Sequence, residues 1–136
     1  MSIGACAGST GVVAVEERNV FSGALGEKIA ALYLQLGGCT ILERNYRFEH
    51  VEIDLIVRDG PCVAFVEVKT RRSSAFGEAL DAVSRDKLRN VRRAARSYLF
   101  AAPAEARADE YRFDLVALDC DWRQGTLKLR HIRGIA

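Results

Sequence analysis

The sequence predicts an α/β protein built on a mixed sheet, with the element order helix, three strands, helix, strand. An Asp-Gly pair at Asp59–Gly60 stands between two apolar runs rich in Val, Ile and Phe, which is typical of a β-hairpin. Two segments with the apolar spacing of helices, 23–36 and 85–100, lie on either side of this hairpin. Because the second helix separates the third strand from the fourth, those two strands can pair in parallel.

The composition is that of an ordinary globular protein. The 136 residues are 49% hydrophobic and 28% charged with a net charge of +2, which suffices for one core and excludes no class of partner. No apolar run approaches a membrane span, so we expect no membrane contact. The four cysteines are widely spaced without a CxxC motif, which favours reduced thiols in a cytoplasmic protein. We expect a flexible leader over residues 1–20 and a single domain over 21–136.

The first helix is predicted over residues 23–36, with Ser22 as its N-cap and Gly37 and Gly38 as its stop. Its predicted buried stripe, at i, i+4, i+7 and i+11, is Leu25, Ile29, Leu32 and Leu36. Glu27 lies roughly opposite that stripe, among glycine and alanine residues. Its carboxylate either points toward a functional site or is a first-turn acid that complements the helix dipole. Residues 39–47 then predict a strand.

Charged residues interrupt the central hairpin, whose strands are predicted over 51–57 and 62–69; these residues are Glu52, Asp54, Glu67 and Lys69. Unpaired charges are costly to bury, so this conflict with the apolar pattern indicates a site. With Asp59–Gly60 as a two-residue turn, Asp54 faces Phe65 and Glu52 faces Glu67. Asp54, Glu67 and Lys69 then share one face of the sheet, whereas a slip of one residue would move Asp54 to the other face.

Two carboxylates beside a lysine suit a hard cation, because Mg²⁺ prefers one or two carboxylates together with water. The alternative is an inert, solvated ion pair between Glu67 and Lys69 at a strand end. His50 and His131 are too few and too far apart in the sequence to predict a zinc site.

Basic residues follow the hairpin. Arg71 and Arg72 lie in a predicted loop at 70–74, and Ser84 is the predicted N-cap of the second helix, over 85–100. The apolar stripe of this helix is Leu88, Val91, Ala95 and Leu99, with Tyr98 beside it. Its basic stripe is Arg85, Arg89, Arg92 and Arg96, and Lys87 projects from the opposite flank. The basic stripe either follows a phosphate backbone or is merely a solvated helix face.

The C-terminal third completes the predicted sheet. Residues 105–110 are polar and predict a loop, 112–119 predict a buried strand, and 126–133 predict an edge strand.

The order of elements, with Asp on the second strand and Glu-x-Lys on the third, resembles the PD-(D/E)XK nuclease superfamily. This resemblance implies a restriction-endonuclease-like core, an αβββαβ mixed sheet flanked by helices. The match is closer still to the YraN family of bacterial proteins, and it covers about residues 23–119. The segments that carry it are GEKIAALYLQLGGCTILERNYR, VEIDLIVRDG, FVEVKTR, FG, VSRDKLRNVRRAARSYL and RFDLVALD.

The resemblance assigns roles to individual residues. The metal-binding acid of the superfamily falls on Asp54, and its Glu-x-Lys pair falls on Glu67 and Lys69. The helix-one acid of relatives similar to archaeal Holliday junction resolvases falls on Glu27. Lys87 matches a position where related nucleases place a basic or amide residue near the site.

Two features depart from these patterns. The family usually has Gly before Glu-Ile-Asp, where this sequence has Val51, preceded by the bulkier His50. The proline that the superfamily places before its first acid is replaced by Ile53. Access of a substrate at this strand entrance is therefore expected to differ.

The resemblance implies hydrolysis of phosphodiester bonds with Mg²⁺ or Mn²⁺. Asp54 and Glu67 would hold the ion with the Val68 carbonyl, and Glu27 would bind it through water or support a second ion. Lys69 would orient water or stabilise developing charge. DNA is the expected partner, contacted through its backbone by Arg71, Arg72, Arg85, Lys87, Arg89, Arg92 and Arg96.

Two other classes of protein remain open. A nucleic-acid-binding module would keep the basic stripe but show no metal-dependent hydrolysis, and a protein-interaction scaffold would bind its partner without salt sensitivity. The oligomeric state is also open, a homodimer included.

Overall fold

The computed structural model describes residues 21–71, 83–121 and 123–136. Within these ranges it confirms the predicted order of elements. The expected leader, residues 1–20, and Arg72 lie outside the described residues. The elements are η1 (Phe21–Leu25), α3 (Gly26–Leu36), β1 (Thr40–Phe48), β2 (Val51–Asp59), β3 (Cys62–Arg71), α5 (Arg85–Ala101), η2 (Ala104–Ala106), β4 (Glu110–Asp121) and β5 (Thr126–Ile132).

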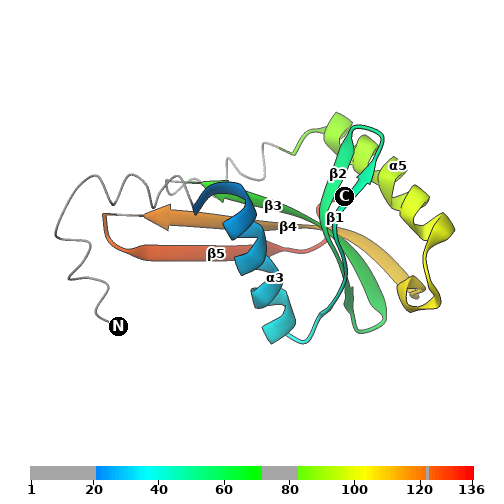
Figure 1. Cartoon of the computed structure of the whole chain (residues 1–136), viewed down its shortest axis with the longest axis horizontal. Helices are drawn as coiled ribbons and strands as arrows, with labels where there is room; N and C mark the ends of the chain where they lie inside the picture. Colours follow the sequence, from blue (N-terminus) through cyan, green and yellow to red (C-terminus); the bar gives the residue numbers. More distant parts are fainter. Residues whose placement is uncertain (1–20, 72–82, 122) are drawn as a thin grey trace.

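The five strands form one sheet in the order β1-β2-β3-β4-β5. Neighbouring strands pair antiparallel except β3 and β4, which pair in parallel across the connection that contains α5. The predicted crossover and mixed sheet are therefore confirmed. Figure 1 shows the twisted sheet, with α3 crossing its face and α5 at the end formed by β1 and β2.

The two helices cover opposite faces of the sheet. On β3, Val63 and Phe65 pack in the cluster beneath α5, whereas Ala64 and Val66 pack in the cluster beneath α3. Successive side chains of a strand point to opposite faces, so β3 is buried on both sides. This double burial explains why residues 62–66 form a continuous apolar run rather than an alternating one.

Helix α3 packs through small residues and Leu34, and of the predicted stripe only Ile29 packs against the core, where it is half-buried. Its buried residues are Gly26, Ala30, Ala31 and Leu34. Leu25, Leu32 and Leu36 are instead 37%, 57% and 81% exposed. The cause is a close approach to the sheet, because a Cβ atom on Gly26 would lie 2.2 Å from Thr70 Oγ1. The small residues at this end of the helix allow that approach, and Leu25, Leu32 and Leu36 are turned outward while Leu34 remains in the core.

Helix α3 also begins later than predicted. A π-helical turn over Phe21–Leu25 precedes it, and its N-cap position is Leu25, which has helical backbone angles and no capping side chain. Ser22 is therefore not the N-cap of the α-helix. Because helical backbone precedes Gly26, a polar side chain is not needed at this end.

Helix α5 begins as predicted, since the Ser84 hydroxyl accepts a hydrogen bond from the Lys87 amide at 3.1 Å. Its buried residues are Val91, Ala94, Ala95 and Tyr98. The predicted stripe members Leu88 and Leu99 are only half-buried. The contact face is centred on the Tyr98 ring, which packs edge-on against Tyr46 and Phe65 at centroid distances of 5.2 and 6.3 Å.

The central hairpin turns one residue later than predicted. Asp59 pairs with Cys62, so Gly60 and Pro61 form the turn, and Phe65 faces Ile56 rather than Asp54. The predicted pairing of Glu52 with Glu67 is also wrong, because the ladder between β2 and β3 ends at Leu55 and Val66 and includes neither glutamate. A register change of two residues does not exchange the faces of a strand, but it moves Asp54 toward the level of Glu67.

None of the helices in the described ranges is long and apolar enough to cross a membrane. The described cysteines, Cys39, Cys62 and Cys120, carry free thiols. Burial raises the pKa of the Cys62 and Cys120 thiols.

Candidate functional site

Strand β2 changes face at Asp54. Ile53 packs in the cluster beneath α5, whereas Leu55 packs in the cluster beneath α3. Ile53 and Leu55 are two residues apart, so in a regular strand their side chains would lie on the same face of the sheet. The ladder between β1 and β2 pairs the residues on either side of this point but does not pair Asn45 with Asp54. The change of face is therefore centred on Asp54.

The Asp54 carboxylate lies where β2 and β3 separate, a place we call the fork. The ladder between these strands ends at Leu55 and Val66, although both strands continue. Beyond it, the Val68 amide donates a hydrogen bond to Asp54 Oδ2 at 2.8 Å. The Asp54 carboxylate therefore accepts the hydrogen bond that the Val68 amide would otherwise donate to a carbonyl of the neighbouring strand.

The electrostatic environment of the fork disfavours a charge on Asp54, whose residue is only 9% exposed. Burial, followed by the charge of Glu67, raises the pKa of Asp54 to about 7, against the lowering effect of the Val68 amide. The charges of Glu27 and Glu52 raise it further. Asp54 is thus a buried acid whose pKa is raised by burial and by several neighbouring carboxylates. This pattern is common at functional sites.

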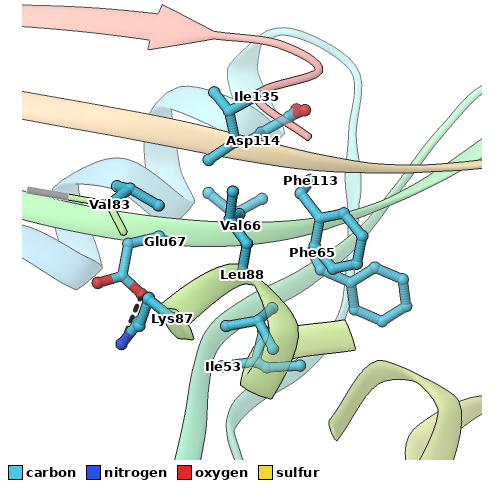
Figure 2. A pocket seen from close by; sticks show the side chains of 11 residues that line it. Ile53, Phe65, Val66, Glu67, Val83, Lys87, Leu88, Phe113, Asp114 and Ile135 are labelled. Atoms are coloured by element: carbon cyan, nitrogen blue, oxygen red, sulfur yellow. Dashed lines mark ion pairs between the residues drawn. The ribbon is translucent and has the colours of Figure 1, made fainter. Parts of the chain in front are cut away.

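Glu67 is held by two lysines. Its Oε2 lies 3.1 Å from Lys69 Nζ, and its Oε1 lies 3.5 Å from Lys87 Nζ. Figure 2 shows the Lys87 side chain reaching from α5 to Glu67 on β3. The structure thus joins the Glu-x-Lys pair and Lys87, which are predicted separately, in one group. Both ammonium groups are about one third exposed, so these ion pairs remain open to exchange with solvent ions.

Glu27 approaches the fork from α3. Its Oε1 accepts a hydrogen bond of 2.7 Å from Asn45 Nδ2, and its charge acts on Asp54. Asn45 is a functional candidate that the sequence analysis missed. The available signal is an asparagine, a poor strand former, in the middle of a predicted strand.

The fork offers few protein ligands to a divalent cation. In the described ranges, no three His, Cys, Asp or Glu side chains are grouped closely enough to hold a metal ion. Asp54 and Glu67 alone match the one or two carboxylates that Mg²⁺ requires, with water in the remaining positions. The pKa of Asp54 is raised first by burial and then by the charge of Glu67, and a nearby cation would offset both effects. The carboxylate oxygens of Asp54 and Glu67 are therefore chemically suited to a hard cation.

The predicted basic residues are divided between two places. Arg71 lies half-buried at the end of β3, whereas the four arginines of the α5 stripe are exposed. A surface hollow is lined by Arg85, Leu88, Arg89, Arg92 and Ala136. Arg96 does not line it, and Arg89 also pairs with Asp86 at 3.0 Å.

A second hollow lies beneath Glu67, lined mainly by apolar side chains of the sheet, α5 and the C-terminal segment (Figure 2). Its volume is about 20 Å³, which is room for roughly one water molecule. This hollow is therefore too small for a substrate. Leu88 lines both hollows, so the arginine-lined surface adjoins the Glu67 side of the fork.

A second buried carboxylate, Asp114 on β4, was also not singled out from the sequence. It accepts hydrogen bonds from Arg112 Nε at 2.9 and 3.1 Å, from the Gly134 amide at 3.1 Å, and lies 2.8 Å from His131 Nε2. Burial alone would raise the pKa of Asp114, but the bonds from His131, Arg112 and Gly134 hold it below its usual range. The surroundings of Asp114 therefore stabilise its ionised carboxylate, whereas the surroundings of Asp54 destabilise the ionised form.

These elements define an α/β protein with a restriction-endonuclease-like core and an acidic fork between its second and third strands. The chain belongs to the uncharacterised protein family UPF0102, whose model matches residues 26–118, and the resemblance to the YraN family is confirmed.

Relatives in several bacteria resemble most of the chain. A UPF0102 protein of Beutenbergia cavernae is 44% identical over 113 residues, 83% of this chain and 93% of the relative. A UPF0102 protein of Chlorobium chlorochromatii is 44% identical over 115 residues, 82% of this chain and 87% of the relative. A third, from Syntrophus aciditrophicus, is 45% identical over 103 residues, 74% of this chain and 78% of the relative.

Proposed function

We propose that this protein is a cytoplasmic, divalent-cation-dependent nuclease that hydrolyses phosphodiester bonds of DNA. The observation that carries the proposal is the buried Asp54 carboxylate, which lies in a fork beside Glu67 with its pKa raised to about 7. A protein gains no stability from burying an acid that is disfavoured as a charge. Such an arrangement is more readily understood as a site prepared for a cation.

Asp54 and Glu67 would hold Mg²⁺ or Mn²⁺, with the Val68 carbonyl as a further ligand. When bound, the cation supplies Lewis-acid polarisation of the scissile phosphate and activation of the attacking water. Glu27 would contribute through water, since its carboxylate is held by Asn45. Lys69 would then donate to the phosphate oxygens and stabilise the charge that develops during hydrolysis.

Nucleic acid would reach the fork along α5. Arg85, Arg89 and Arg92 offer exposed cationic groups on one hollow, and Lys87 joins this helix to Glu67. Contacts of this type bind the phosphate backbone and carry little sequence information. Arg71, at the end of the strand that carries Glu67 and Lys69, would extend the same surface.

The direct test is cleavage of duplex, single-stranded, flap and four-way-junction substrates, in DNA and RNA forms, with Mg²⁺ and with Mn²⁺. Glu67→Gln should abolish both cation binding and cleavage, because it removes a ligand. Lys69→Ala should retain or strengthen Mn²⁺ binding, since a nearby positive charge is gone. Its cleavage should fall roughly 10²–10³-fold, as for other groups that stabilise a transition state.

Glu43→Gln is a matched control, because it neutralises an exposed carboxylate on β1 outside the fork. It should leave cleavage unchanged. Wild-type protein that binds no divalent ion at millimolar concentration and cleaves none of these substrates would refute the nuclease proposal.

A second candidate function is a nucleic-acid-binding module without hydrolysis. The observation that favours it is that both oxygens of Glu67 face a lysine, so a cation must compete with Lys69 and Lys87 for this carboxylate. Binding that depends on salt without metal-dependent cleavage would support this function over the nuclease.

The contribution of the α5 arginines can be measured separately. Replacing Arg89, Arg92 and Arg96 with Ala should flatten the slope of log affinity against log salt, by about 0.9 for each phosphate of duplex DNA that the variant no longer neutralises. The triple variant of Lys128, Arg130 and Arg133, three exposed basic residues at or beside β5, removes the same charge and serves as the control. If the two triple variants have equal slopes, the α5 stripe is only a solvated helix face.

A further inference from the structure

Asn45 has an unusual backbone conformation for its place in the fold. Its φ is 51°, in the left-handed region, in the interior of β1. Among described non-glycine residues, only Glu49, in the connection between β1 and β2, shares a positive φ. A turn explains Glu49, but the interior of a strand does not need this conformation. Such outliers in regular elements are enriched at functional sites.

The left-handed residue lies at the level where β2 changes face. The β1–β2 ladder omits the pair of Asn45 with Asp54, while residues on both sides remain paired. Across the sheet, Asp54 Oδ2 accepts the Val68 amide at 2.8 Å. The ladder is also interrupted between Ile41 and Glu43, away from Asp54. An extended backbone at Asn45 would allow Asn45 to pair with Asp54 in register with the pairs on either side, and Asp54 would then point to one packed face instead of into the fork.

The side chain of Asn45 makes a second contribution. Its amide group lies 2.7 Å from Glu27 Oε1 on α3. Because an ionised carboxylate only accepts hydrogen bonds, the amide nitrogen is the atom that faces it. This bond restrains a half-buried acid on a helix whose other contacts with the sheet are mainly apolar.

We propose that Asn45 is a positioning residue of the acidic fork: its left-handed backbone releases Asp54 from the ladder, and its amide holds Glu27 toward the same site. This inference rests on the proposed function. Asparagine suits both tasks, because it tolerates the left-handed region better than most residues and carries a donor. Glycine could adopt the left-handed backbone but has no side-chain donor. Alanine has no donor and also disfavours the left-handed backbone.

Three variants separate the two contributions. Asn45→Gly keeps access to the left-handed backbone but removes the amide, and Asn45→Ala also disfavours the backbone. Glu49→Gly is the matched control, because it relaxes the other left-handed residue of the same hairpin, whose side chain pairs with Arg93 outside the fork. The readouts are Mn²⁺ affinity by calorimetry and exchange of the Val68 amide by NMR.

We expect Asn45→Gly to weaken Mn²⁺ binding roughly tenfold, as is usual for a residue that orients a metal site through another group. Exchange of the Val68 amide should stay slow in this variant. Asn45→Ala should weaken Mn²⁺ binding further and accelerate Val68 exchange, because Asp54 withdraws from the fork. Glu49→Gly should match wild type in both measurements.

A double-mutant cycle tests whether the amide acts through Glu27. Combining Asn45→Gly with Glu27→Gln should weaken Mn²⁺ binding no more than Glu27→Gln alone. Additive losses, or wild-type affinity in Asn45→Gly, would overturn the role of the amide. Slow Val68 exchange in Asn45→Ala would overturn the role of the backbone. Failure of the wild-type protein to bind Mn²⁺ would instead overturn the proposed function, while the exchange comparison still reports on the backbone.

Discussion

Replacing Asp54 with Asn should make the protein more stable at pH 8 and abolish the divalent-cation binding that we propose. The carboxyl pKa is raised from 3.8 to about 7 in the folded protein, so ionising Asp54 opposes folding. The folded state binds the proton more tightly than the unfolded chain. Stability from this group is therefore lost as the pH rises from about 4 to about 7, and the full cost persists above pH 7.

At about 1.4 kcal/mol per pKa unit, we expect Asp54→Asn to gain roughly 2–4 kcal/mol at pH 8 and little at pH 4. Urea denaturation of wild type and variant across this range measures the difference directly. Asp109→Asn, which neutralises an exposed acid before β4, is the control and should show no such pH dependence. A variant that is less stable than wild type at pH 8 would contradict the account of Asp54.

Replacing Asp114 with Ala should have the opposite and comparably large effect. Its carboxylate is fully buried and bonded to Arg112, His131 and the Gly134 amide. Removing it takes the acceptor from Arg112 Nε and from the Gly134 amide, although Arg112 Nη2 still pairs with Asp59 at 2.8 Å. Hydrogen bonds to a charged group typically contribute about 1.5–3 kcal/mol each, so the total loss should be several kcal/mol. Because the pKa of Asp114 is lowered by folding, its stabilisation is present above the ordinary pKa and is lost as the pH falls through the lowered one.

The same strand offers a matched control for this prediction. Asp119 is also buried, but its Oδ1 has no hydrogen-bond partner in the described part of the chain. Asp119→Ala should therefore cost much less than Asp114→Ala in urea denaturation. Equal losses for both variants would mean that burial alone, rather than the bonded network, determines the contribution of Asp114.

The contrast between Asp54 and Asp114 separates two uses of a buried carboxylate. Donors surround Asp114, so its charge stabilises the fold. Asp54 receives one backbone amide and is otherwise affected by burial and by other acids, so its charge destabilises the fold. The ionised carboxylate of Asp54 thus lowers the stability of the fold, and it lies beside Glu67, which is paired with two lysines. Residues that cost stability are common at functional sites, and this is the physical basis for proposing a cation site there.

The sequence by itself determined the elements and the kinds of residue at the fork. Apolar runs, the Asp-Gly hairpin signal and helical spacing are local properties, so the order of elements and the crossover between β3 and β4 could be predicted. The charged residues Asp54, Glu67 and Lys69 were conspicuous because they interrupt apolar runs. These predictions need no knowledge of which surfaces meet.

Only the tertiary structure decided which faces are buried and where the acids point. With Gly26 close to Thr70, Leu32 and Leu36 of α3 lie outward and Leu34 lies in the core, although the spacing alone indicates a stripe that includes Leu32 and Leu36. The left-handed Asn45 and the early end of the β2–β3 ladder directed Asp54 into the fork, and a turn at Gly60–Pro61 set the register. The raised pKa of Asp54 depends on burial and on Glu67 and Glu27. Such effects arise between segments distant in the chain, so no local pattern in the sequence encodes them.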